Sequence, residues 1–175
     1  TDLSTAVQTA SPVIGGDPSY LRMVRIMKQI RDAQIGRDEK PGGLYVELLT
    51  YWAFIGGARA DSYAELLVEV LDSVAAQLGS GRRLIEPAMN NPYEPQPDPA
   101  DLTRARDVFL HLAARARAAL DLDDCAAALV WREMLGRNDK VGWCFPLPPG
   151  CSESGTRVVA LANRDRGPND DRGFA

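Results

Sequence analysis

The sequence predicts a mainly α protein, a compact bundle of about five helices. Apolar residues recur at helical spacing along most of the chain up to Gly136, capping residues precede several of these segments, and strand-like stretches are short. With 175 residues and 45% hydrophobic content, the chain can bury one sizeable core. We therefore expect a connector over 1–16, a helical bundle domain over 17–151 and a flexible C-terminal tail over 152–175.

The first helix is expected at about 17–35. Asp17 supplies an N-cap and Pro18 occupies the first helical position, a combination typical of helix starts. A helical wheel places Tyr20, Met23, Ile26, Met27 and Ile30 on one arc and Arg22, Arg25, Lys28 and Gln29 on the opposite arc. This helix should therefore have one core face and one cationic face.

The second helix, about 44–55, is apolar almost all round and should be buried. Gly56 follows its end. Ser62 and Glu65 then form an S-x-x-E capping box that opens the third helix, whose apolar residues keep helical spacing to Leu78. These two helices should supply much of the core.

The stretch 79–99 carries several prolines and is expected to be a loop. Within it, only Arg83–Ile85 resembles a strand, and Val158–Leu161 is the other strand-like run. The fourth helix is expected at about 99–120 and the fifth at about 122–135. This gives the five helices of the predicted bundle.

Net charge and hydropathy restrict the class of protein. The formal net charge of −4 argues against a surface that binds nucleic acid all over, so any phosphate site should be local. No apolar run approaches the roughly 20 residues of a membrane-spanning helix, and Thr1 does not open a signal peptide. We expect a cytoplasmic protein with no membrane partner. The absence of an initial methionine suggests a partial chain.

The three cysteines, Cys125, Cys144 and Cys151, contain no C-x-x-C pair and are expected to be reduced thiols near the core. Cys144, Cys151 and His111 would make a poor set of zinc ligands, so we predict no metal site. His111 lies in mid-helix at an apparently half-buried position. Walker-type, H-E-x-x-H and G-x-S-x-G motifs are absent, so we predict no catalytic residue in this chain.

The cationic face of the first helix is the candidate binding surface. Arg25 and Lys28 lie one turn apart and could converge on phosphate oxygens, Arg25 through its planar fork and Lys28 as a point charge. The alternative is a solvated helix face, which is the usual role of such a pattern.

Three sequence blocks occur in an informative order: L-R-M-V-R-I-M-K-Q-I (21–30), G-L-Y-V-E-L-L-T-Y-W-A-F (43–54) and R-L-I-E-P-A-M-N-N-P (83–92). Together with W-R-E-M-L-G (131–136), they resemble the C-terminal helical part of the oligoadenylate synthetase and bacterial cyclic-oligonucleotide synthase (CD-NTase) nucleotidyltransferases. The resemblance covers about 1–136. It implies the C-terminal helical half of an α+β nucleotidyltransferase, with 1–16 as the connector from an absent catalytic domain.

The resemblance assigns roles to particular residues. Lys28 matches the family lysine that contacts the nucleotide triphosphate, and Tyr45, 17 residues later, matches an aromatic position that can stack on a base. We add Arg25 as a third substrate contact. The alternative interpretation of Tyr45 is a core aromatic residue. Glu47 matches an acidic position expected to anchor the hinge, whereas Leu44 departs from the polar residue of several relatives.

The function implied by the resemblance belongs to a larger enzyme. The parent would join ATP or other NTPs into a cyclic or linear oligonucleotide second messenger in bacterial anti-phage (CBASS) signalling. Its N-terminal catalytic domain would hold Mg²⁺ on carboxylates, so this chain alone should be inactive. Expected partners are that domain, nucleotide triphosphates and a regulatory protein or effector. The alternatives are a non-catalytic helical module that binds protein or RNA, and a fragment of a tRNA- or antibiotic-modifying nucleotidyltransferase.

Overall fold

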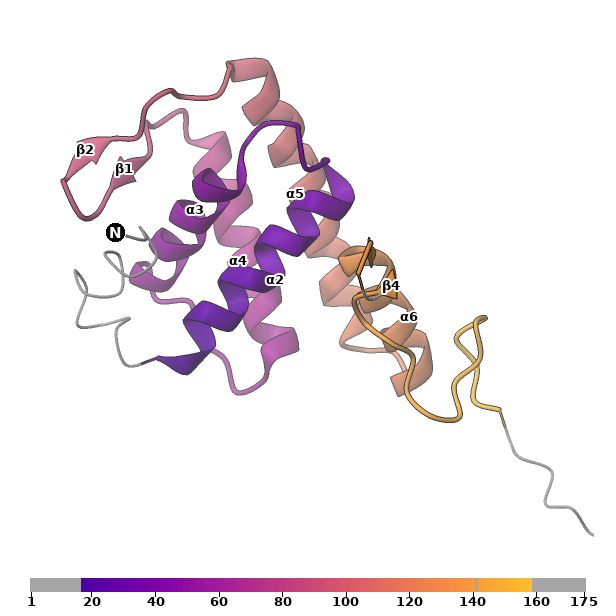
Figure 1. Cartoon of the computed structure of the whole chain (residues 1–175). Coiled ribbons are helices and arrows are strands. Elements are labelled where there is room, and N and C mark those ends of the chain that lie inside the picture. Colours follow the sequence, from indigo (N-terminus) through magenta and orange to yellow (C-terminus); the bar gives the residue numbers. More distant parts are fainter. Residues whose placement is uncertain (1–16, 141, 159–175) are drawn as a thin grey trace, which may run out of the picture.

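A computed structural model describes residues 17–140 and 142–158 of the protein. Within these residues the chain forms five helices and two short β-hairpins (Figure 1). The helices are α2 (Pro18–Gln34), α3 (Gly43–Ile55), α4 (Tyr63–Gly79), α5 (Pro99–Ala119) and α6 (Asp124–Leu135). Antiparallel pairs are formed by β1 (Ile85–Glu86) with β2 (Asn91–Pro92) and by β3 (Arg137–Asn138) with β4 (Gly142–Trp143). The mainly α bundle expected from the sequence is confirmed.

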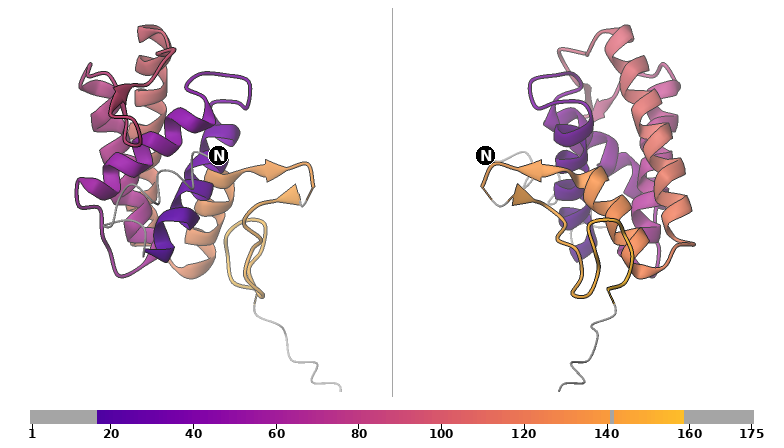
Figure 2. Two further views of the ribbon diagram at one scale, coloured as in Figure 1. Left: turned by 60° about the vertical axis from the view of Figure 1, so that its left-hand side comes forward. Right: turned by 90° about the vertical axis from the view of Figure 1, so that its right-hand side faces the viewer.

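Helices α4 and α5 make the most extensive contact between two helices of the bundle. Helix α3 packs on α2 and on α4, and α6 packs on α5 and on the end of α2. Figure 2 shows that the β3–β4 hairpin and the following segment lie outside the bundle, next to α6. The core therefore lies among α2, α3, α4 and α5 and includes Met134 of α6, whereas the β3–β4 hairpin and the segment after it are an addition to the bundle.

Helix α3 is central because its apolar residues point in all directions. The predicted burial of this helix is confirmed. Nine of the ten residues from Tyr45 to Phe54 are buried, and the exposed positions, Leu44 and Ile55, lie at the two ends of the helix. The largest fully buried side chains of the core also include Tyr20 and Phe109 from the neighbouring helices. A helix enclosed in this way is held on every side by close packing.

Capping residues hold the starts of α2 and α4 as the sequence predicts. The Asp17 carboxylate accepts a hydrogen bond of 2.9 Å from the backbone N–H of Ser19 at the start of α2. The Ser62 hydroxyl oxygen accepts from the backbone N–H of Glu65 at 3.2 Å and its hydroxyl donates to the Glu65 carboxylate at 2.9 Å. Helix α6 begins slightly later than expected, because Asp123 caps it by accepting from two backbone N–H groups.

Gly136 ends α6 at a position that requires glycine. Its φ is +63°, and a Cβ atom there would lie 2.7 Å from the Cβ atom of Ala33 in α2. The close approach of α6 to the end of α2 therefore depends on the missing side chain.

The expectation of reduced cysteines is wrong for Cys125 and Cys151, which form a disulfide with a Cα–Cα distance of 5.3 Å. Cys144 is a free thiol. The bond joins the first turn of α6 to a loop 26 residues later in the sequence. Such pairing depends on how the loop folds back on the helix, which the spacing of the cysteines does not reveal.

The loop after the disulfide packs on α6. Gly155 is buried, and the Glu153 carboxylate accepts a hydrogen bond of 2.7 Å from the Arg132 guanidinium. The predicted tail begins at 152, and its first residues, 152–158, lie against α6. The rest of that tail, 159–175, lies outside the described residues, as does the predicted connector, 1–16. Strand β1 lies one to two residues beyond the expected Arg83–Ile85, because Ile85 pairs with Pro92 across a tight hairpin.

Two further expectations concern the sites. His111 is exposed on α5, so the half-buried position inferred from its apolar neighbours is wrong. Cys151 is oxidised and cannot act as a thiolate ligand, and the described residues contain no group of three His, Cys, Asp or Glu side chains that could hold a metal ion. Over the same residues, none of the helices has the length and apolar character needed to cross a bilayer.

Candidate functional site

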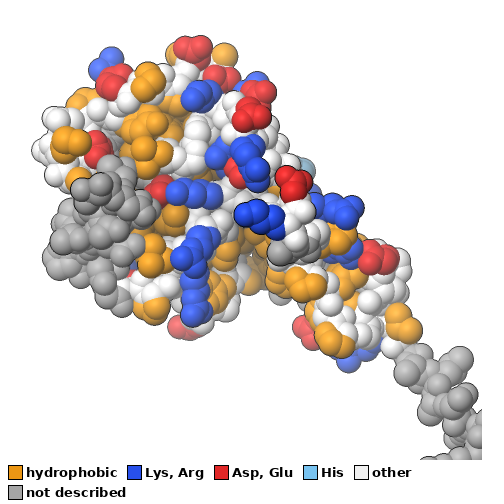
Figure 3. Space-filling view, in the orientation of Figure 1, with side chains coloured by type: hydrophobic (Ala, Val, Ile, Leu, Met, Phe, Trp, Pro, Cys, Tyr) orange, Lys and Arg blue, Asp and Glu red, His pale blue; other side chains and the backbone are white. Residues whose placement is uncertain are grey.

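The cationic face of α2 is present and accessible. Arg22 and Arg25 are exposed, and the Lys28 side chain retains 37% of its surface. In Figure 3, Lys and Arg side chains gather along the face over α2. Arg22 is engaged, because its guanidinium donates to the Tyr63 hydroxyl at 3.2 Å and lies 5.8 Å from the centre of that ring. Arg25 forms no ion pair or hydrogen bond with another described residue.

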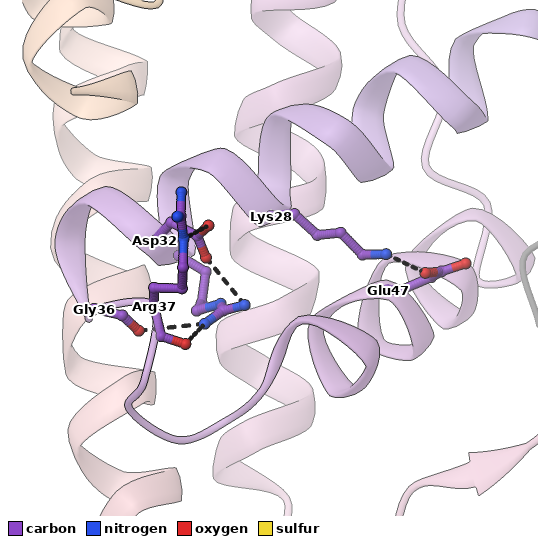
Figure 4. A network of polar contacts seen from close by, with 6 residues as sticks. Lys28, Asp32, Gly36, Arg37 and Glu47 are labelled. Atoms are coloured by element: carbon purple, nitrogen blue, oxygen red, sulfur yellow. Dashed lines mark hydrogen bonds and ion pairs between the residues drawn. The ribbon is translucent and has the colours of Figure 1, made fainter. Parts of the chain in front are cut away.

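Lys28 reaches from α2 to α3 and pairs with Glu47 (Figure 4). The Glu47 side chain is only 3% exposed, whereas Lys28 is partly in solvent. An ionised carboxylate at that depth requires a cation close to it, so the ammonium group compensates the burial of Glu47. The pair therefore fixes the end of the Lys28 side chain at a defined place beside α3.

The turn between α2 and α3 is held by Arg31. Its guanidinium pairs with Asp32 at 3.0 Å and donates to the backbone carbonyls of Gly36 at 3.2 Å and Arg37 at 2.8 Å, part of the network in Figure 4. A Cβ atom at Gly43 would lie 2.8 Å from the same guanidinium. The absence of a side chain at Gly43 leaves room for the Arg31 guanidinium beside the start of α3.

Tyr20 lies beside this pair in the core. Burial raises the pKa of its hydroxyl well above the ordinary value, and the negative charge of Glu47 raises it further. Among the described residues the hydroxyl has no hydrogen-bond partner. Tyr20 therefore stays neutral beside the Lys28–Glu47 pair and adds no charge to it.

Tyr45 points away from the side of α3 on which Lys28 of α2 lies. Successive residues of an α-helix turn by about 100°, so positions 45 and 47 point in roughly opposite directions. Tyr45 is 3% exposed, and its ring meets Tyr93 edge to face with centroids 5.4 Å apart. Burial raises the pKa of Tyr45, and Tyr93 adds to the shift. The structure thus brings Lys28 to Glu47, and it places Tyr45 under Tyr93 as a packed aromatic residue.

Next to Tyr45 lies a pocket of about 480 Å³ that the sequence does not predict. It is enclosed by α3, the C-terminal half of α4 and the segment leading into β1, and it includes Trp52, Arg82 and Arg83. The lining residues come from two stretches of the sequence, 45–52 and 73–85. A signal for it exists in Tyr45, Leu49 and Trp52, which share one face of α3 and require a cover.

A wider hollow of about 860 Å³ lies between α5 and Gln34 and contains His111. Its charged side chains already have partners: Arg104 pairs with Asp101 at 2.9 Å, and Asp107 with Arg106 at 2.7 Å. His111 forms no hydrogen bond or ion pair with another described residue, although Asp107 lines the same hollow.

Arg25 and Lys28 place two cations on one face of α2, and the buried Glu47 carboxylate offsets part of the charge of Lys28. Cations of this kind can attract an anion. Comparison of the chain with protein-family models, curated proteins and solved structures gives no match.

Proposed function

We propose that this chain is the nucleotide-binding helical part of a nucleotidyltransferase that makes cyclic or linear oligonucleotide second messengers from ATP or other NTPs. The observation that supports it best is the exposed face of α2, where Arg25 and Lys28 lie one turn apart and Glu47 holds the Lys28 ammonium. The sequence blocks around Lys28 and Glu47, which resemble the helical part of that enzyme class, favour a nucleotide over other anions.

The Lys28–Glu47 pair is compatible with phosphate binding. An ammonium group has three N–H donors, and the pairing with Glu47 can occupy one side of it while the exposed side faces solvent. Holding the group in place lowers the conformational entropy lost when a phosphate binds. Arg25, which has no partner among the described residues, adds a second cation on the same face.

The chemical step belongs elsewhere in the parent enzyme. The described residues offer no cluster of ligands for a metal ion, so they do not fit Mg²⁺, and the catalytic carboxylates would come from another domain. In this proposal the chain supplies binding and orientation of the triphosphate, in the cytoplasm of a bacterium defending itself against phage.

The test is a titration of this chain with ATP, followed by NMR chemical shifts and by calorimetry. Arg25→Ala should weaken binding about fivefold to tenfold, as expected for one partly solvated charge-assisted contact. Lys28→Ala should have an effect of the same size. Lys28→Arg, which keeps a cation for Glu47, separates loss of charge from loss of folding.

Arg106→Ala is the matched control, since it removes one arginine from α5 on another face of the bundle. It should leave ATP binding unchanged. ATP-induced shifts that survive unaltered in an Arg25→Ala/Lys28→Ala double variant with native circular dichroism would refute the assignment of the site.

The same basic face also favours a second candidate, a non-catalytic module that binds RNA or an acidic protein. Arg22, Arg25 and Lys28 follow one stripe of α2, which suits a run of phosphates better than a single nucleotide. A short single-stranded RNA that binds at least a hundredfold more tightly than ATP, with a steep salt dependence, would favour this candidate. A fragment of a tRNA- or antibiotic-modifying nucleotidyltransferase would instead bind ATP and RNA comparably.

A further inference from the structure

The pocket of about 480 Å³ beside α3 has an apolar floor made by a single helix face. Tyr45, Leu49 and Trp52 follow one another at spacings of four and three residues, so their side chains lie in a row. Leu84, from the segment before β1, also lines the pocket. The volume lies within the range of about 300–1,000 Å³ that is common for small-molecule sites.

The walls of the pocket are held by hydrogen bonds. The Trp52 indole N–H donates to the backbone carbonyl of Ile85 at 2.9 Å, which ties the loop to α3. On the other wall, the Gln77 amide donates to the carbonyl of Leu49 at 3.0 Å and to the Ser73 hydroxyl at 3.2 Å. Because these polar groups already have partners, the interior offers mainly aromatic and aliphatic surface.

The charge at the mouth has one sign. Arg82 and Arg83 are the charged residues that line the pocket, and both are exposed. The Arg82 guanidinium forms no ion pair or hydrogen bond with another described residue. Arg83 lies 3.5 Å from Glu94, but both side chains are largely in solvent, so that contact contributes little. In a chain with a net charge of −4, this is a local cationic site.

We propose that this pocket binds a small aromatic anion, with its ring against the partly exposed side chains of Trp52 and Ile85 and its carboxylate or sulfonate at Arg82 and Arg83. A flat ring suits a floor of one aromatic and one aliphatic side chain, and a planar guanidinium can hold such an anionic group through two parallel hydrogen bonds. The site is separate from the Lys28 face because Tyr45 and Glu47 point to opposite sides of α3.

The test uses 1-anilinonaphthalene-8-sulfonate as the probe and follows its fluorescence and the quenching of tryptophan. One molecule should bind per chain. An Arg82→Ala/Arg83→Ala variant should weaken binding about tenfold or more, since both anion contacts are lost. Ala76→Phe, which adds a ring at an exposed position of the pocket wall, should abolish it.

The matched control is Arg104→Ala/Arg106→Ala, which removes two arginines from α5 and should bind the probe as the wild type does. Circular dichroism and the urea midpoint must be native in each variant, because partly unfolded chains also bind this dye. Unchanged affinity in both pocket variants would overturn the proposal. Displacement of the probe by ATP would overturn the separation from the α2 face, whereas failure of ATP to bind anywhere would affect only the proposed function.

Discussion

Breaking the Cys125–Cys151 disulfide should lower the stability of the protein substantially. The bond closes a loop with a sequence separation of 26 residues. The chain-entropy relation for a cross-link gives a contribution of about 3.5 kcal/mol for a loop of this length. The protein loses this full free energy on reduction only if the loop stays on α6, because the relation assumes an unchanged folded state. Its remaining contacts include the Arg132–Glu153 ion pair, so we expect a loss of about 2–3.5 kcal/mol.

The assay is urea denaturation followed by circular dichroism, with and without a phosphine reductant, and alkylation to count thiols. The native chain should present one reactive thiol, Cys144, and the reduced chain three. Cys144→Ser should keep the same response to reductant, whereas Cys125→Ala/Cys151→Ala should lose it. The reasoning fails if the thiol count rises from one to three while the free energy of unfolding stays within about 0.5 kcal/mol, a change typical of a surface substitution.

Three other predictions test the core and the helix caps. Tyr20→Phe should be neutral or stabilising near pH 7, since the hydroxyl is buried without a partner among the described residues. Folding raises the pKa of Tyr20, so in urea titrations above about pH 10 the wild type should lose more stability than Tyr20→Phe, which keeps only the contribution of Tyr45, whose pKa folding also raises. Ser62→Ala should cost about 1 kcal/mol in urea melts by removing the acceptor for the Glu65 N–H, and a cost below the error of the melt would contradict the cap. Phe109→Ala should cost about 3–5 kcal/mol, whereas Leu110→Ala, at an exposed position, should cost under about 1 kcal/mol; equal losses would contradict the assigned faces of α5.

The helices could be predicted because their determinants are local. Asp17 and Ser62 act on backbone groups two and three residues away, and the sequence displays both partners together. The same holds for the basic face of α2, which depends only on helical period. The disulfide could not be predicted, because the approach of Cys151 to α6 depends on a loop that folds back over many residues.

The candidate sites were predictable to different degrees. Lys28 was expected on an accessible face and lies there, but its partner Glu47 was assigned only a role at the hinge. The pocket containing Trp52 and Arg82 was not expected, because its walls are brought together by packing between α3 and a proline-rich loop. The signal available in the sequence was the absence of a polar face on α3. A helix of this kind must be covered by more than its two neighbouring helices, which indicates that a further segment packs on it.

The geometry of α3 decides how a nucleotide could use both residues named by the sequence. Tyr45 and Glu47 lie near the start of α3 and point to opposite sides, so a ligand that contacts Lys28 and Tyr45 together must pass around the start of that helix. Gly42 precedes it, and a Cβ atom there would meet nothing within 4 Å, so there is open space beside Gly42, whereas the Arg31 guanidinium covers Gly43. A triphosphate is long enough to extend around one helix end, but its base would reach the Tyr45 ring only after Tyr93 had moved from its edge-to-face contact. Phosphate binding at Lys28 and base stacking at Tyr45 are therefore separable: inorganic triphosphate tests the first alone, and Tyr93→Ala tests whether uncovering Tyr45 strengthens binding of ATP over inorganic triphosphate.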